Sequence, residues 1–203
     1  MRRKLVFCVC LLMVGVSMLS APLHQSTVEA NMKGEQFSAL AFLPAGAGVR
    51  MVGAGATANV NIYFNSYTSD ADTKQYASML LEGGSDALLK GLQKAKPIGK
   101  VSLVRRVGFF DLKLIRSHPT EGGRRIVGVC DRPIQFLEAY AAGRSMDYTF
   151  GIVILDLKTN DKGKEEGVGE LIYAAKIKVL EGNKIEIENY GVEPAKLQGV
   201  RKQ

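Results

Sequence analysis

The chain has 203 residues, of which 46% are hydrophobic and 23% are charged, and its formal net charge is +7. These proportions are typical of a globular domain, so they argue against a disordered chain, a coiled coil and a protein with several membrane spans. Three cysteines and two histidines provide too few ligands for zinc fingers and too few thiols for a disulfide scaffold.

The first thirty residues predict an export signal, and we assign residues 1–30 to a signal peptide. Basic residues at positions 2–4 precede an uncharged apolar run over 5–19, which is shorter than the roughly twenty residues that cross a bilayer. We expect cleavage after about residue 20 to 30, a mature protein without a transmembrane span, and a periplasmic or secreted location. An uncleaved anchor is the alternative.

Removal of the leader leaves a mildly basic chain. Such a charge suits an anionic small molecule or polymer as a partner, and it does not favour sequence-specific nucleic-acid binding, which needs a concentrated basic patch. Only one cysteine, Cys130, lies beyond the leader, so the mature chain has no intramolecular disulfide and its stability must come from packing.

Residues 31–57 show little periodicity, and glycine and alanine dominate the stretch AGAGVRMVGAGA over 45–56. The glycine spacing does not match the dinucleotide-binding pattern G-x-G-x-x-G. We interpret 31–57 as a Gly/Ala-rich lead-in and expect a single domain over 58–203.

The first elements of that domain are a strand and two helices. Apolar residues alternate with polar ones between 58 and 65, which predicts a half-buried strand. Ser69 and Asp70 begin a helix that runs to about Glu82, where two glycines end it. A second short helix is predicted from Ser85 to a position before Pro97.

The next part of the chain is rich in β-branched and aromatic residues. Residues 101–117 form either one strand with a bulge at Gly108 or two strands that meet there. A turn over 118–123 joins them to a strand over 124–130. A third helix opens at Asp131 and closes at Gly143.

The last part of the chain contains three strands. Residues 148–157 are apolar on both faces, which predicts a central strand, and the polar stretch 158–169 predicts a loop. Residues 171–180 and 184–190 alternate and predict a hairpin with Leu180 opposite Lys184. The other pairs in this register are Lys178 with Glu186, Lys176 with Glu188, Val179 with Ile185, and Ile177 with Ile187.

Together these elements predict an α+β domain. We expect a mostly antiparallel sheet of about six or seven strands, with two or three short helices over one face. Alternating βα units are not seen, which disfavours a doubly wound nucleotide-binding fold.

Residues suited to catalysis are few. Cys130 is separated from His118 by an extended strand that places the thiol about 20 Å from the imidazole, too far for proton transfer. Asp131, Glu138 and Asp147 offer paired carboxylates of the kind that glycoside hydrolysis uses, although Asp131 also suits a helix cap. We expect no catalytic residue, no metal site and no cofactor.

Arginine is the most distinctive feature of the sequence. Guanidinium groups bind carboxylate, sulfate and phosphate, so a basic cleft is one interpretation and neutralisation by nearby acidic residues is the other. The candidate ligand-binding residues are Arg116, Arg124, Arg125, Arg132 and Arg144, and Arg105 and Arg106 lie in the same part of the chain.

The stretches GRRIV, DRPI and GRSMDY, together with the ending VRKQ, resemble those of a group of exported bacterial proteins. The resemblance spans roughly residues 58–203 and implies export but no activity. Our leading hypothesis is an exported, non-enzymatic binding or accessory protein of the bacterial envelope that holds an anionic ligand through the arginine region. The alternative is an envelope glycan hydrolase or lyase with paired carboxylates. A third reading is a domain that only joins other envelope proteins.

Overall fold

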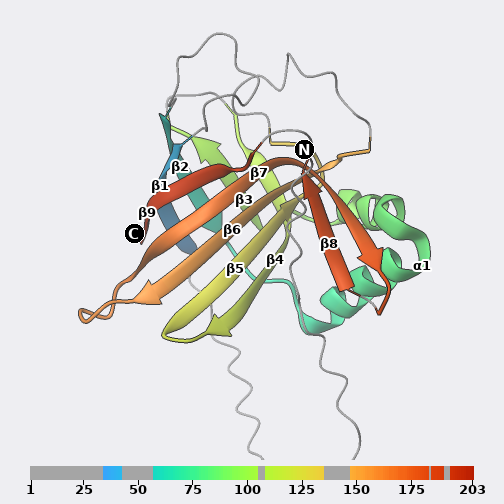
Figure 1. Ribbon diagram of the computed structural model, residues 1–203, viewed down its shortest axis with the longest axis horizontal. Helices are drawn as coiled ribbons and strands as arrows, with labels where there is room; N and C mark the ends of the chain where they lie inside the picture. The colour runs from blue at the N-terminus through green and yellow to red at the C-terminus, as the bar shows by residue number, and fades with distance from the viewer. Residues whose placement is uncertain (1–33, 43–56, 105–107, 135–146, 183, 190–192) are drawn as a thin grey trace, which may run out of the picture.

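The computed structural model describes residues 34–42, 57–104, 108–134, 147–182, 184–189 and 193–203. The helix α1 and the nine strands in these ranges make up most of the described chain (Figure 1). In chain order they are β1 (Glu35–Phe42), β2 (Thr57–Phe64), α1 (Asp70–Lys94), β3 (Gly99–Leu103), β4 (Phe110–Thr120), β5 (Gly123–Cys130), β6 (Phe150–Thr159), β7 (Glu165–Leu180), β8 (Lys184–Asn189) and β9 (Ala195–Lys202).

Eight of the described strands form a closed antiparallel barrel. Each strand from β1 to β7 pairs with the next, and β9 returns between β7 and β1 to complete the ring. The remaining strand, β8, lies outside the ring and pairs with the second half of β7. Closing a sheet into a ring gives each of its strands a partner on both edges.

The barrel corrects the predicted α+β fold. The expected sheet lacked two strands: β1 lies within the stretch interpreted as a lead-in, and β9 lies in the last residues of the chain. The folded domain therefore begins at β1 and not at residue 58. In the described ranges there is one helix, because the two expected helices form a single element with the predicted cap at Ser69 and a kink at Gly84.

Side chains fill the barrel interior. Residues at alternate positions of each ring strand point inward, because successive side chains of a strand lie on opposite faces. They include Phe37, Ile62, Leu112 and Leu155, each fully buried. An eight-stranded ring is just wide enough for such side chains to meet at its centre.

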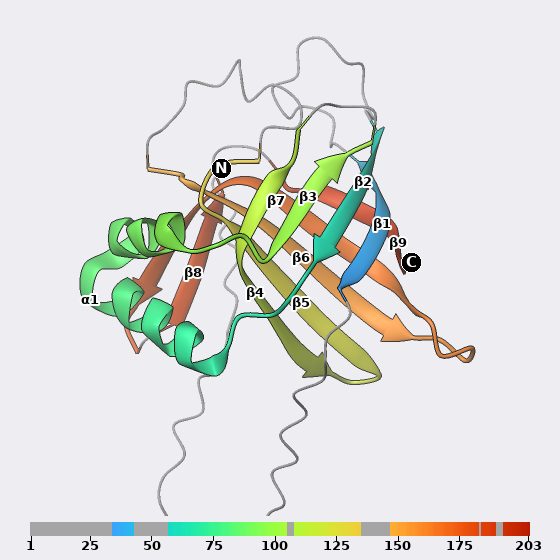
Figure 2. The ribbon, with the colours of Figure 1, turned by 180° about the vertical axis from the view of Figure 1, so that it is seen from behind.

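A second hydrophobic core lies outside the ring. Outward-facing residues of β5, β6 and β7 pack against α1, with Leu92 and Ile152 fully buried there. Figures 1 and 2 show α1 beside β8 on one side of the barrel, with β1, β2 and β9 on the other side. No helix in the described ranges is both long and apolar enough to span a membrane.

Several of the expected elements are confirmed. The β7–β8 hairpin has the predicted register throughout, and β6, with partners on both edges, is the expected central strand. Of the two interpretations of 101–117, the structure shows two strands, because β3 ends at Leu103 and β4 begins at Phe110. The loop expected over 158–169 is shorter, because β7 already begins at Glu165.

The helix predicted from Asp131 does not start there. Residues 131–134 have no helical structure, and 135–146 lie outside the described residues. The Ile134 side chain is only 1% exposed and packs into the barrel core. Gly151 makes room for it, because a Cβ at that position would lie 2.4 Å from the Ile134 Cγ1 atom.

We expect the Ile134→Ala substitution to lower the free energy of unfolding by about 2–5 kcal/mol, because it leaves a cavity in the barrel core. Urea denaturation measures this loss. Val168→Ala is the control, because Val168 is 56% exposed and its truncation should cost less than about 0.5 kcal/mol. Equal effects of the two substitutions would show that the segment after β5 does not pack into the barrel.

Candidate functional site

A cluster of charged side chains closes one mouth of the barrel, and we name it the mouth cluster. Arg124 donates two hydrogen bonds to Glu165, both of 2.6 Å, and a third of 2.8 Å to Glu35. Lys202 lies 2.6 Å from Glu35 and 3.1 Å from Glu165. The Tyr67 hydroxyl donates to Glu35 and accepts from Arg124. Two positive and two negative charges balance within the cluster.

The strand register positions these side chains. Glu35 and Glu165 are the first residues of β1 and β7, Arg124 is the second residue of β5, and Lys202 ends β9. In an up-and-down ring, these strand ends meet at the same mouth. Each residue lies on the inward face of its strand, the face that also carries core residues such as Phe37, two positions after Glu35.

Partial burial strengthens the electrostatics of the mouth cluster. Burial alone raises the pKa of Glu35, but hydrogen bonds from Arg124, Lys202 and Tyr67 outweigh it and lower this pKa to about 2. The same balance lowers the pKa of Glu165. Burial and the hydrogen bond to Glu35 raise the pKa of Tyr67, so the phenol keeps its proton and remains a donor.

Arg116 and Arg125 have partners outside this cluster. Arg116 forms an ion pair with Asp70 and donates to the Thr68 carbonyl oxygen. Arg125 points outward and holds Asp156 through two hydrogen bonds of 2.5 and 3.0 Å.

Arg132 and Arg144 complete the predicted set. Arg132 donates to the Phe109 carbonyl oxygen and lies over the Phe110 ring. It follows the far end of β5, a strand length away from Arg124. Arg144 lies outside the described residues. The structure therefore does not bring Arg116, Arg124, Arg125 and Arg132, the described members of the set, together in one basic cleft.

The residues considered for catalysis are also separated. His118 pairs with Arg125 at the start of β5, and Cys130 ends that strand. Burial raises the pKa of the Cys130 thiol. Asp147 lies 3.9 Å from Lys176, and Glu138 lies outside the described residues. The described residues contain no cluster of three or more potential metal ligands.

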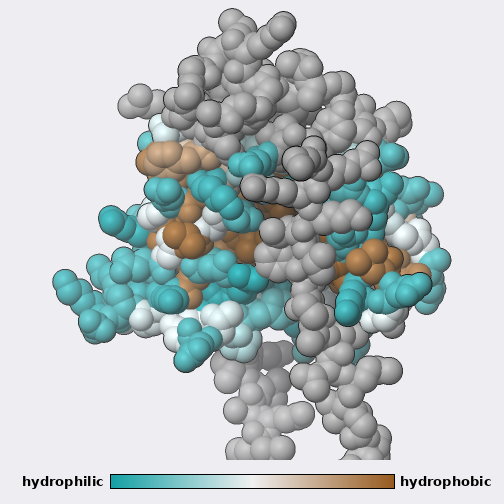
Figure 3. All heavy atoms as spheres, in the orientation of Figure 1, coloured by the Kyte–Doolittle hydropathy of each residue, from teal (hydrophilic) through white to brown (hydrophobic). Residues whose placement is uncertain are grey.

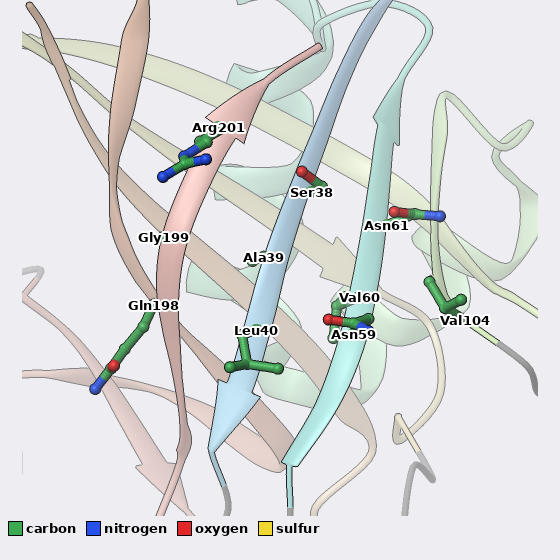
Figure 4. Close-up of a pocket in the computed structure, with 10 residues that line it drawn as sticks. All are labelled: Ser38, Ala39, Leu40, Asn59, Val60, Asn61, Val104, Gln198, Gly199 and Arg201. Carbon is green, nitrogen blue, oxygen red and sulfur yellow. The ribbon is translucent and has the colours of Figure 1, made fainter.

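A hollow of about 460 Å³ lies on the outer wall of the barrel, and we name it the outer-wall pocket (Figure 4). It crosses β9, β1 and β2, on the side of the barrel opposite α1. Its lining residues are Ser38, Ala39, Leu40, Asn59, Val60, Asn61, Val104, Gln198, Gly199 and Arg201.

The strand register arranges the outward side chains of this pocket in two rows. Ser38 of β1 is opposite Arg201 on one side and Asn61 on the other. In the next row, Leu40 is opposite Gln198 and Asn59. Figure 4 shows both rows crossing the three strands.

The polar groups of the pocket are available to a ligand. Within the described ranges, the side chains of Arg201, Asn59 and Asn61 form no hydrogen bond or ion pair. Glu166 is opposite Arg201 in the register, but its carboxylate accepts from Asn160. Ser38 accepts a hydrogen bond of 2.7 Å from Gln203 and keeps its own proton to donate.

None of these pocket residues is among the predicted site residues, although the sequence contains a signal for two of them. Asn59 and Asn61 occupy the polar face of the strand that the alternation predicted. Asparagine is disfavoured in strands, so two asparagines on one face suggest a role other than strand formation. Arg201 gave no such signal, because β9 itself was not predicted.

No family model, curated protein or solved structure matches the chain. The fold is a closed eight-stranded antiparallel barrel. The candidate site on this barrel is assigned from the positions and contacts of its own residues.

The mouth cluster predicts acid-dependent stability. The pKa of Glu35 is lowered from 4.5 to about 2 on folding, so the unfolded chain takes up the proton first as the pH falls. The stabilisation is complete above about pH 5 and is lost between about pH 5 and pH 2, and we expect Glu35 to contribute on the order of 1–2 kcal/mol.

Chemical denaturation of the wild type and of Glu35→Gln across this pH range measures the contribution. The variant should be less stable than the wild type at pH 7, and its stability should fall less steeply on acidification. If the stability of Glu35→Gln fell as steeply with decreasing pH as that of the wild type, Glu35 would not be the source of the acid dependence.

Proposed function

We propose that the protein is an exported, non-enzymatic binding protein of the bacterial envelope that holds an anionic ligand in the outer-wall pocket. One observation carries this proposal: the guanidinium of Arg201 lies in a hollow of about 460 Å³ and has no partner in the described ranges. Pockets of this size accommodate small organic ligands.

The contrast with the other described arginines supports Arg201 as the ligand residue. Arg116, Arg124 and Arg125 are each paired with a carboxylate, and Arg132 binds a backbone carbonyl. An arginine that is already held by fixed partners gains little from a ligand, because an existing hydrogen bond must break first. Arg201 loses only water when it binds an anion.

The barrel supports binding on its wall. Large apolar residues fill the interior in the described part of the chain, and the ring holds β9, β1 and β2 in fixed register beneath the pocket. A site on such strands keeps its geometry without a ligand, which lowers the entropic cost of binding.

The hydrolase alternative has less support in the described contacts. Asp147 is adjacent to Lys176. In the sequence, Asp131 and Asp147 are separated by 135–146, a stretch outside the described residues. A pair of facing carboxylates, with one of them desolvated, is what that chemistry needs. The unpartnered arginine and amides favour binding over hydrolysis.

Chromatography on a sulfated polysaccharide matrix tests the proposal. Arg201→Gln should elute at clearly lower salt than the wild type, because the residue that contacts the anion is lost. Lys162→Gln is the matched control: it removes one positive charge from the exposed turn between β6 and β7 and should change the elution much less. Equal effects of the two substitutions would leave only net charge as the cause and would contradict the proposal.

A further inference from the structure

We infer that the ligand of the outer-wall pocket is an acidic saccharide, which binds with its carboxylate on Arg201 and its hydroxyl groups on Asn59 and Asn61. This inference rests on the proposed function, and it adds the chemical class of the ligand. It follows from the kinds of group in the pocket and from their spacing across the three strands.

The composition of the pocket favours one negative charge surrounded by hydroxyl groups. Among the described lining residues, Arg201 is the one cation, whereas Asn59, Asn61 and Gln198 contribute neutral amides. A side-chain amide offers both a donor and an acceptor, which matches a hydroxyl group that does the same. A compact anion such as phosphate presents mostly acceptor oxygens and few donors, so it matches the amide oxygens less well than a set of hydroxyl groups does.

The spacing fits an extended ligand. Arg201 and Asn61 flank Ser38 in one row, so two strand spacings of roughly 4.8 Å each separate their backbones. That span accommodates two linked sugar rings laid across the strands. Ser38, between them, has a hydroxyl proton to donate.

Apolar atoms between the polar groups suit the C–H faces of sugar rings. Leu40 lies in the row between Gln198 and Asn59, and Val104, which is 41% exposed, lines the pocket beyond Asn59. Figure 3 shows hydrophobic surface among hydrophilic side chains on the side where β1 and β9 lie. Burial of such surface against a ring adds affinity without requiring further charges.

Gly199 accounts for the hollow itself. The pairing of β1 with β9 is irregular between Ser38 and Leu40, where β9 bulges. Gly199 has a φ of +57°, and a Cβ built there would meet nothing within 4 Å, so the space above it is open. The bulge separates Gln198 from Arg201 along β9, and Gly199 between them places no side chain in the pocket.

A peptide ligand fits the pocket less well. Extended peptides commonly bind by adding a strand to a free sheet edge. Each of β9, β1 and β2 already has a partner on both edges, so binding here depends on side chains alone. This favours a ligand that presents hydroxyl groups rather than a peptide backbone.

Titrations of the purified protein, followed by backbone NMR shifts, test the inference with four probes: digalacturonate, the neutral disaccharide cellobiose, inorganic phosphate and an acidic tripeptide. Digalacturonate should bind most tightly of the four. Arg201→Gln should weaken its binding at least about tenfold, and Asn59→Ala/Asn61→Ala should weaken it by a similar factor. Lys162→Gln is the control and should bind like the wild type, and thermal melts check that every variant is folded.

The outcomes separate the two claims. Phosphate could bind as tightly as digalacturonate or more tightly, in a way that depends on Arg201 but not on Asn59 and Asn61. That result would show that the ligand is not a saccharide, while the pocket would still be an anion-binding site. Tighter binding of the tripeptide would likewise overturn the saccharide class. If no anionic probe binds in an Arg201-dependent way, both the inference and the proposed function are wrong.

Discussion

Closure of the barrel depends on β9, which pairs with β1 along one edge and with the first half of β7 along the other. Without this strand the sheet would be open, and the inward faces of β1 and β7 would lose their common core. The mouth cluster reinforces the same closure, because Lys202 of β9 binds Glu35 of β1 and Glu165 of β7. Backbone pairing and partly buried charges thus hold the same three strands together, and the outer-wall pocket lies across this closure.

The strand register of the ring also determines which charged side chains have partners within the protein and which can bind other molecules. Inward positions at the mouth bring Arg124 between two glutamates, where its charge is neutralised. Outward positions on β5 and β6 pair Arg125 with Asp156. On β9 the alternation places Arg201 outward, opposite a glutamate that is already engaged by Asn160. Availability for a ligand therefore follows from strand register and not from the density of arginines along the chain.

Much of the local structure was predictable from the sequence because local signals were strong. Alternating lysine, glutamate and isoleucine fixed the β7–β8 register, since a slip by one residue would expose apolar side chains. Ser69 marked the start of α1. The two missed strands gave weak signals: β1 faces the core with two alanines beside Phe37, and a bulge at Gly199 interrupts the alternation of β9. These strands close the ring. Because they were not predicted, the predicted fold class was wrong and Arg201 was not recognised as a candidate site residue.

The pairing of the first strand with the last also has a consequence for how the chain acquires its structure. β1 and β9 are neighbours in the ring but lie at opposite ends of the folded sequence, and the contact between Lys202 and Glu35 spans 167 positions. Such long-range pairing makes folding slow. The ring cannot be completed until β9 has been synthesised, so a chain that lacks this strand keeps two open sheet edges, one on β1 and one on β7.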